Sequence, residues 1–160
     1  MNLSIICAVG YKNLIGNQSK LPWIIKEDLK YFRYLTLGKT IVMGRVTFSS
    51  IGKFLVDRKN IILTKKKKYK VNNCIIVNSP KDSIRNIFPY NECIIIGGFY
   101  MYNIFHKYCN YMYITKIYGK HCGNKHFPGI NMKDWILVSY INRNNYQYVL
   151  YKRNTKNIKF

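Results

Sequence analysis

The amino-acid sequence predicts a single α/β domain built on a mixed, mostly parallel β-sheet. Short apolar runs recur along the 160 residues, and most are continuous, which is typical of strands buried on both faces of a parallel sheet. Segments of helical length separate several of these runs, as parallel strands require. Near the C-terminal end, two apolar runs flank a polar turn, which indicates an antiparallel hairpin at one edge. We expect one domain over residues 1–160, because the chain is too short for two ordinary domains.

Six apolar runs are the candidate strands of the parallel part of the sheet. In chain order they are Leu3 to Val9, Thr40 to Met43, Asn60 to Thr64, Cys74 to Val77, Cys93 to Ile96 and Tyr111 to Ile117. The hairpin joins residues 136–141 to residues 146–151 through a turn at residues 142–145.

Three segments between these strands are predicted to be helices. The first is residues 26–37, which are followed by Gly38, a residue type that commonly ends a helix. The second begins after Ser79, a favourable N-cap residue, with Pro80 at its first position, and continues to about residue 87. The third runs from residue 98 to about residue 106.

The chain is strongly basic, with 27 Lys and Arg residues against 6 Asp and Glu residues and a net charge of +21. Such a balance is typical of proteins that bind nucleic acids. However, Lys, Asn, Ile and Tyr together supply 77 of the 160 residues, and the codons of all four are rich in A and T. We therefore interpret most of the basicity as genome composition, and the run Lys65 to Lys68 as a solvated loop.

The cysteine and hydropathy patterns predict a soluble, cytoplasmic protein. The five cysteines are odd in number and show no Cys-x-x-Cys spacing, which favours reduced thiols over disulfides or a zinc site. The segment from His121 to His126 lacks a fourth ligand at a suitable spacing, so no metal is expected. No apolar run approaches the ~18 residues of a membrane span, and no signal peptide begins the chain.

Asp28 is the acidic residue that the sequence singles out. On a helix of 3.6 residues per turn it shares a stripe with Ile25, Leu29, Phe32 and Leu35. A carboxylate on a buried stripe is costly unless something binds it, so Asp28 is a candidate functional group. Alternatively, it interacts with the positive end of the helix macrodipole, and the spacing leaves both interpretations open.

Two strand-to-helix junctions are suited to anions. The first places Gly97 and Gly98 directly after an apolar run, where glycine lets a ligand approach the backbone and a helix N-terminus offers N–H groups. The second, at residues 43–48, adds Arg45 and Thr47. Together they suggest a dinucleotide-sized ligand.

The order of these elements resembles dihydrofolate reductase of the bacterial chromosomal type. The resemblance runs in register from about Leu3 to Tyr151, and it is specific because many weak motifs occur in one order. In chain order, the motifs are Gly16, Leu21-Pro22-Trp23, Asp28, Phe32, Met43-Gly44-Arg45 with Thr47, Ser50-Ile51-Gly52, Arg58 to Thr64, Ile96-Gly97-Gly98 with Tyr102, Thr115 and His126-Phe127-Pro128.

The resemblance implies an eight-stranded, mostly parallel mixed sheet with about four flanking helices and a C-terminal hairpin. It also implies reduction of 7,8-dihydrofolate to tetrahydrofolate by hydride transfer from NADPH, which supplies one-carbon metabolism, and binding of antifolates such as methotrexate or trimethoprim. Family members of this length are usually monomers, so we expect a monomer without a nucleic-acid or membrane partner. In this family the nicotinamide ring of the cofactor stacks on the pterin ring of the substrate in a dry cleft, where proximity and electrostatics would promote hydride transfer.

The family's functional residues map onto matching positions here. Asp28 would bind the pterin ring and favour its protonation at N5, with Thr115 donating a hydrogen bond to Asp28 and Trp23 holding a water beside it. Leu21, on the active-site loop, completes the implied catalytic set. Arg58 would pair with the glutamate α-carboxylate of the substrate. The remaining implied substrate contacts are Ile6, Cys7, Leu29, Phe32, Ile51 and Leu55.

The implied cofactor site includes both anion-suited junctions. Ala8 and Ile15 would meet the carboxamide, Tyr102 the nicotinamide, Gly98 and Thr47 the pyrophosphate, and Arg45 with Lys65 the 2′-phosphate. In this family a cis peptide bond joins the two glycines. The further implied cofactor contacts are Gly16, Gly44, Val46, Leu63, Thr64, Ile96, Gly97, Phe99, Tyr100 and Met101.

Three positions depart from the family pattern. Asn124 stands where relatives often have an aspartate that accepts hydrogen bonds from the active-site loop, residues 10–24, so closure of the loop should be less favoured. Phe99 replaces a small residue beside the pyrophosphate, and Leu21 replaces a methionine at nearly constant volume. Two alternatives remain open: a pyrimidine reductase of the riboflavin pathway with the same fold, and a basic nucleic-acid-binding module.

Overall fold

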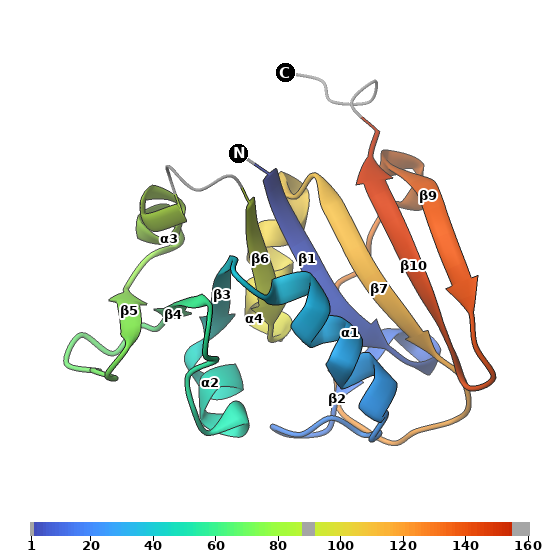
Figure 1. The fold of residues 1–160 in the computed structure, drawn as a ribbon, viewed down its shortest axis with the longest axis horizontal. Coiled ribbons are helices and arrows are strands. Elements are labelled where there is room, and N and C mark those ends of the chain that lie inside the picture. The colour runs from blue at the N-terminus through green and yellow to red at the C-terminus, as the bar shows by residue number, and fades with distance from the viewer. Residues whose placement is uncertain (1, 88–91, 155–160) are drawn as a thin grey trace.

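The structure is a computed structural model that describes residues 2–87 and 92–154. Its centre is an eight-stranded sheet in the order β5-β4-β3-β6-β1-β7-β10-β9 (Figure 1). The strands are β1 (Asn2–Val9), β3 (Thr40–Gly44), β4 (Lys59–Leu63), β5 (Cys74–Val77), β6 (Glu92–Gly97), β7 (Tyr111–Ile117), β9 (Trp135–Asn142) and β10 (Tyr146–Arg153). The helices are α1 (Lys26–Thr36), α2 (Arg45–Ile51), α3 (Pro80–Ile87) and α4 (Phe99–Phe105), and three 3-10 turns are η1 (Tyr11–Asn13), η2 (His106–Tyr108) and η3 (Met132–Asp134).

The strand directions confirm the predicted mixed sheet. β5, β4, β3, β6, β1 and β7 run parallel to one another. β10 is antiparallel to β7, and β9 is antiparallel to β10, so the C-terminal hairpin forms one edge as expected. All eight predicted strands are present, with ends within two residues of the sequence prediction.

The predicted helix ends are also close to those observed. α1 ends one residue early, at Thr36, and Gly38 adopts φ +71° while its N–H donates to the Asp57 carbonyl oxygen at 2.8 Å. At α3, the Ser79 hydroxyl oxygen accepts from the Asp82 N–H at 3.1 Å and itself donates to the Asp82 carboxylate at 2.6 Å. This reciprocal arrangement confirms Ser79 as the N-cap residue.

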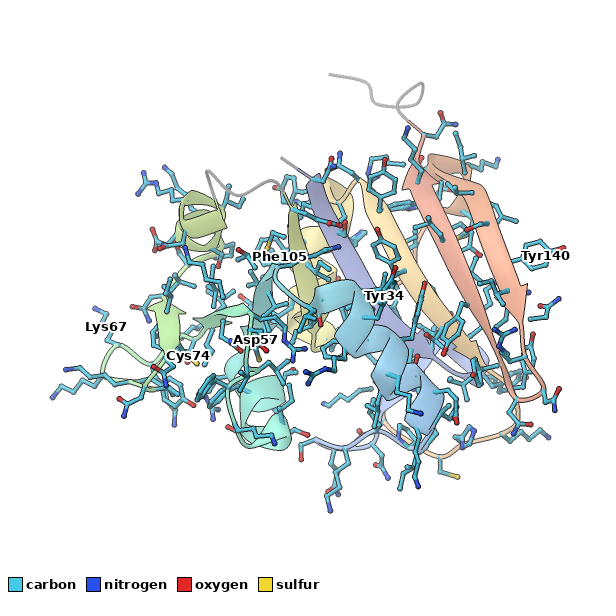
Figure 2. The ribbon with its side chains drawn as sticks, in the orientation of Figure 1. Tyr34, Asp57, Lys67, Cys74, Phe105 and Tyr140 are labelled. Carbon is cyan, nitrogen blue, oxygen red and sulfur yellow. The ribbon has the colours of Figure 1, made fainter. Side chains whose placement is uncertain are left out.

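The sheet has an apolar core on each face because alternate residues of its strands point to opposite sides. On one face, Ile5, Ile95 and Phe105 of α4 belong to one cluster of buried side chains. On the other, Ile41 and Ile94 pack with residues of α1 and α2. Figure 1 shows α1 in front of the sheet and α4 behind it. Phe105 is fully buried, whereas Tyr34 on α1 is 78 % exposed; both are labelled in Figure 2.

A second, two-stranded sheet was not predicted. β2 (Leu14–Gly16) pairs with β8 (Lys125–His126), and the Phe127 N–H continues the pairing by donating to the Asn13 carbonyl oxygen at 2.7 Å. Such short segments carry no periodic signal, so only the contact between residues far apart in the chain defines them. The pair fixes residues 13–16 against residues 124–127.

Gly123 allows this close approach. A Cβ atom at position 123 would lie 2.5 Å from the Gly16 carbonyl oxygen and 2.7 Å from Leu14 Cδ1. At Gly129, by contrast, nothing lies within 4 Å of such an atom. The absence of a side chain at position 123 is therefore a packing requirement of the β2–β8 pair.

We expect Gly123→Ala to lower the free energy of unfolding by roughly 1–3 kcal/mol, because the added methyl group overlaps backbone atoms. Gly129→Ala is the matched control and should change it by less than about 0.5 kcal/mol. Urea unfolding of both variants measures the difference. Equal stability of the two variants would contradict the requirement at Gly123.

Candidate active site

A partly buried hydrogen bond joins α1 to the sheet at the candidate site. Asp28 lies in the first turn of α1, and Thr115 lies on β7 with 2 % of its surface exposed. The Thr115 hydroxyl donates to Asp28 Oδ1 at 2.6 Å. The carboxylate is thereby held at a fixed position between the helix and the sheet.

The surroundings of Asp28 disfavour its charged form. Burial raises the pKa of Asp28, and the hydrogen bond from Thr115 partly offsets this by lowering it. Within the described residues, no lysine, arginine or histidine forms an ion pair with this carboxylate. Asp28 can therefore accept hydrogen bonds from the N–H groups of a ligand without competition from a protein cation.

Two tyrosines that sequence reasoning did not assign to the site flank Asp28. Tyr148 on β10 pairs in register with Thr115, and its ring lies 4.0 Å, centroid to centroid, from that of Tyr31 on α1. Burial raises the pKa of both hydroxyls, and the Asp28 carboxylate raises them further. Tyr31 is three residues from Asp28, so helical spacing could have indicated it, whereas Tyr148 depends on strand pairing.

Trp23 lies beside this region with an unpartnered donor. Its side chain is buried, and Nε1 has no hydrogen-bond partner among the described residues. Its ring packs at 5.3 Å, centroid to centroid, edge-on to that of His121. A buried indole N–H usually finds a partner, so this atom is suited to a water or a ligand. Leu21, on the same segment, is 52 % exposed.

The implied substrate contacts fall into two groups. Ile6, Phe32, Ile51 and Leu55 belong to one apolar cluster on the α1 face of the sheet, and Leu29 is exposed on α1. Cys7 differs, because strand alternation places its side chain in the cluster on the opposite face. Burial raises the pKa of Cys7 to about 12, so this thiol stays protonated.

Arg58 is positioned by α1 and the following loop. Its Nη1 donates to Thr36 Oγ1 at 3.0 Å, and its Nε donates to the Val56 carbonyl oxygen at 3.0 Å. Partial burial and then the neighbouring Arg33 lower the pKa of Arg58. No described carboxylate forms an ion pair with this guanidinium, so a positive group is held in place at the end of α1.

The two anion-suited junctions are adjacent in space, because β3 pairs with β6 and Met43 lies opposite Gly97. The peptide bond between Gly97 and Gly98 is cis. A Cβ atom on Gly98 would lie 3.0 Å from Thr47 Oγ1, and one on Gly97 would lie 3.1 Å from the Tyr102 hydroxyl. Gly97, Gly98 and Thr47 thus form a tight pocket, here called the glycine cradle, in which a side chain on either glycine would crowd Thr47 or Tyr102.

The other implied cofactor residues surround this cradle or the loop. Tyr102 is buried, and its hydroxyl donates to the Ile6 carbonyl oxygen at 3.0 Å. Met101 is fully buried, and Val46, Phe99 and Tyr100 are exposed, so the bulky Phe99 points away from the core. The remaining residues lie on β1 or β2 (Ala8, Ile15, Gly16), at the junctions (Gly44, Arg45, Ile96), or at the end of β4, which pairs with β3 (Leu63, Thr64, Lys65).

Besides the β2–β8 pair, side-chain hydrogen bonds hold the loop of residues 10–24. The Asn124 Oδ1 atom accepts from the Gln18 N–H at 2.9 Å, so the amide makes the type of contact expected of an aspartate there. The Ser50 hydroxyl, on α2, donates to the Ser19 carbonyl oxygen. Sequence reasoning missed Ser50 as a loop contact, since nothing in a local pattern relates it to residue 19.

Neither a metal-binding cluster nor a membrane-spanning helix occurs among the described residues. Across residues 2–87 and 92–154, no group of three or more His, Cys, Asp or Glu side chains is arranged to hold a metal ion. In the same part of the chain, no helix has the length and apolar character needed to cross a membrane.

Comparison with known proteins agrees with this geometry. Residues 2–155 match the family model described as dihydrofolate reductase. The dihydrofolate reductase of Bacillus subtilis is 39 % identical over 137 residues, covering 86 % of this chain and 82 % of the relative. That of Buchnera aphidicola is 39 % identical over 138 residues, covering 86 % and 84 %.

A solved structure extends the similarity to the whole fold. Dihydrofolate reductase from Enterococcus faecalis, complexed with NADP(H) and RAB-propyl, superposes with a TM-score of 0.89 at 29 % identity, covering 96 % of each chain. The match in fold, in family model and in curated relatives leads to one assignment: this chain belongs to the dihydrofolate reductase family.

Proposed function

We propose that this protein reduces 7,8-dihydrofolate to 5,6,7,8-tetrahydrofolate with NADPH, and so supplies tetrahydrofolate to one-carbon metabolism. The observation that carries the proposal is the partly buried carboxylate of Asp28, held by Thr115 without an ion pair to a described cation, in a chain of this family. NADPH is the cofactor because the E. faecalis relative binds NADP(H) and the glycine cradle suits a phosphate-bearing ligand.

Asp28 would orient the pterin ring by accepting hydrogen bonds from its N–H groups. A desolvated carboxylate is a strong acceptor, and its negative charge favours protonation of the pterin at N5. Trp23 Nε1, buried and unpartnered, would hold a water or a polar atom of the ligand near this carboxylate. Ile6, Phe32, Ile51 and Leu55 would wall the rings and exclude water.

Arg58 would bind the α-carboxylate of the substrate's glutamate. Its Nε and Nη1 are held by Val56 and Thr36, and its Nη2 makes no hydrogen bond to the residues that the structure describes. The bonds to Thr36 and Val56 fix the guanidinium plane, which reduces the conformational entropy lost on binding.

Gly97, Gly98 and Thr47 would hold the pyrophosphate, and Arg45 with Lys65 the 2′-phosphate. When bound, NADPH supplies the hydride for the reduction. The lack of side chains at the cradle permits close approach of a phosphate, which supports this assignment.

We further propose that the enzyme is a cytoplasmic monomer that binds antifolates and has no nucleic-acid partner. A titration with methotrexate distinguishes this function from a pyrimidine reductase of the same fold. Saturating binding supports dihydrofolate reduction, whereas the absence of binding together with the absence of NADPH oxidation would refute it.

Asp28→Asn should lower kcat/KM for dihydrofolate by roughly 100- to 10,000-fold, the range typical of lost acid–base and electrostatic catalysis. The assay follows the loss of NADPH absorbance on addition of dihydrofolate. Glu27→Gln removes the exposed carboxylate next along the same helix and is the matched control, expected to retain activity. Full activity of Asp28→Asn would remove Asp28 from the mechanism.

Asp28 should also reduce stability at neutral pH. Its pKa in the folded protein is raised above the ordinary value of 3.8, so the folded state binds more protons than the unfolded state between the two pKa values. The stabilising effect of this group is therefore lost as pH rises through the folded pKa. We expect the free energy of unfolding of Asp28→Asn to exceed that of the unmutated protein at pH 7, and the difference to narrow toward pH 4.

Urea unfolding at pH 7, 6, 5 and 4 measures this difference, with Glu27→Gln treated in parallel. If the difference in the free energy of unfolding between Asp28→Asn and the unmutated protein widens as the pH falls, the pKa of Asp28 is not raised in the folded state and the prediction is wrong.

Asn124 should control the loop of residues 10–24 through the Gln18 N–H. Asn124→Ala removes the acceptor, and a typical hydrogen bond corresponds to roughly a 2- to 10-fold change in an equilibrium. Amide hydrogen exchange at Gln18 should accelerate by that factor in Asn124→Ala and slow in Asn124→Asp, where the acceptor is charged. Identical exchange in all three proteins would show that this contact does not hold the loop.

A further inference from the structure

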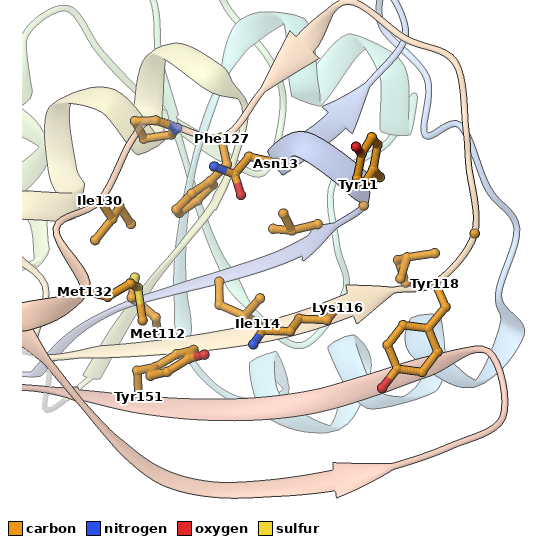
Figure 3. Close-up of a pocket in the computed structure, with 15 residues that line it drawn as sticks. Tyr11, Asn13, Met112, Ile114, Lys116, Tyr118, Phe127, Ile130, Met132 and Tyr151 are labelled. Carbon is orange, nitrogen blue, oxygen red and sulfur yellow. The ribbon is translucent and has the colours of Figure 1, made fainter.

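A cavity of about 610 Å³ lies on the face of the sheet opposite to Asp28. Its floor is formed by β7 and β10, and its walls by residues 9–11, Asn13 and the segment around Phe127 and Ile130 (Figure 3). Buried side chains such as Met112, Ile114 and Tyr151 supply the floor. The volume lies within the range of about 300–1,000 Å³ typical of small-molecule sites.

This cavity is separate from the proposed reaction site. Successive residues of a strand point to opposite faces, so β7 directs Thr115 toward Asp28 and directs Ile114 and Lys116 into the cavity. None of the side chains assigned to substrate or cofactor lines it. A ligand could therefore occupy it while both folate and NADPH are bound.

The cavity contains a single charge. Lys116 is the one charged residue among those that line it, and the other lining side chains are apolar, aromatic or an amide. Figure 3 shows the Lys116 side chain lying along the floor, and its ammonium is 5.7 Å from the centroid of the Tyr151 ring. Within the described residues, no carboxylate forms an ion pair with Lys116.

We propose that this cavity binds a small amphipathic anion, with an aromatic or aliphatic body and one carboxylate or sulfonate group. The apolar floor would bury the body of the ligand, since burial of apolar surface supplies most of the binding free energy. Lys116 would pair with the anionic group. The absence of acidic residues in the lining excludes repulsion of that group and disfavours cationic ligands.

The probe for this site is 8-anilinonaphthalene-1-sulfonate, which joins an apolar ring system to one negative charge and fluoresces in apolar surroundings. It is titrated into the protein saturated with NADPH and methotrexate, so that the reaction cleft is filled. We expect one dye molecule to bind per chain. Dye that is displaced by NADPH and methotrexate would belong to the reaction cleft and would overturn the proposal.

Lys116→Met should weaken dye binding about tenfold, the size of a lost charge-assisted contact. Lys120→Met removes an exposed lysine outside the cavity and is the matched control, expected to bind as the unmutated protein does. The neutral analogue N-phenyl-1-naphthylamine should bind equally to all three proteins. Equal dye affinity of Lys116→Met and Lys120→Met would refute the role of Lys116.

Ile130→Trp tests the location by filling the cavity. The variant should bind neither dye. NADPH-dependent turnover of dihydrofolate, measured on the same sample, shows whether the variant is folded. If Ile130→Trp is folded and binds both dyes normally, the ligand lies elsewhere and the proposal is wrong.

Discussion

The hydrogen bond from Thr115 to Asp28 connects the two parts of the protein on which the active site depends. α1 contributes the carboxylate and β7 contributes the hydroxyl, 87 residues apart along the chain. The tilted ring contact between Tyr31 and Tyr148 reinforces the same contact from the neighbouring strand. Because two independent contacts fix α1 against the sheet, the carboxylate remains in place although burial disfavours its charge.

The parallel part of the sheet determines where the cofactor residues meet. β3, β4 and β6 are neighbours that run in the same direction, so their carboxyl ends lie at one edge. Each strand continues there into residues of the proposed cofactor site: Arg45 and Thr47 after β3, Thr64 and Lys65 after β4, and Gly98 after β6. Ligand sites at the carboxyl ends of parallel strands are a general property of such sheets.

The sequence predicted what depends on local pattern or on ordered motifs. Strands such as residues 74–77 and 111–117 were predicted to the residue, because continuous apolar runs between polar segments have few other solutions. The stripe that contains Ile25 and Phe32 correctly predicted that Asp28 faces the sheet, although Leu29 on the same stripe is exposed. Spacing alone did not decide between a ligand-binding role and a helix-dipole role. The resemblance supplied Thr115 as its partner.

What the sequence did not predict depends on contacts between distant segments. The β2–β8 pair, the Ser50–Ser19 contact and the placement of Tyr148 opposite Thr115 arise from strand register and loop packing. Cys7 shows a related limit: the resemblance implies that it contacts the substrate, but strand alternation directs its side chain to the other face, so such a contact would involve its backbone. Adjacent residues of one strand cannot both present side chains to the same ligand.

The net charge of +21 makes the lack of a cation at Asp28 notable. Among six acidic residues, Asp28 is the one that lies beside a buried hydroxyl with no cation to neutralise it. A salt bridge would have stabilised the carboxylate, but it would also have occupied the oxygens that a pterin ring must reach. In a chain so rich in lysine and arginine, the lack of a described ion pair at Asp28 leaves this carboxylate open to a ligand.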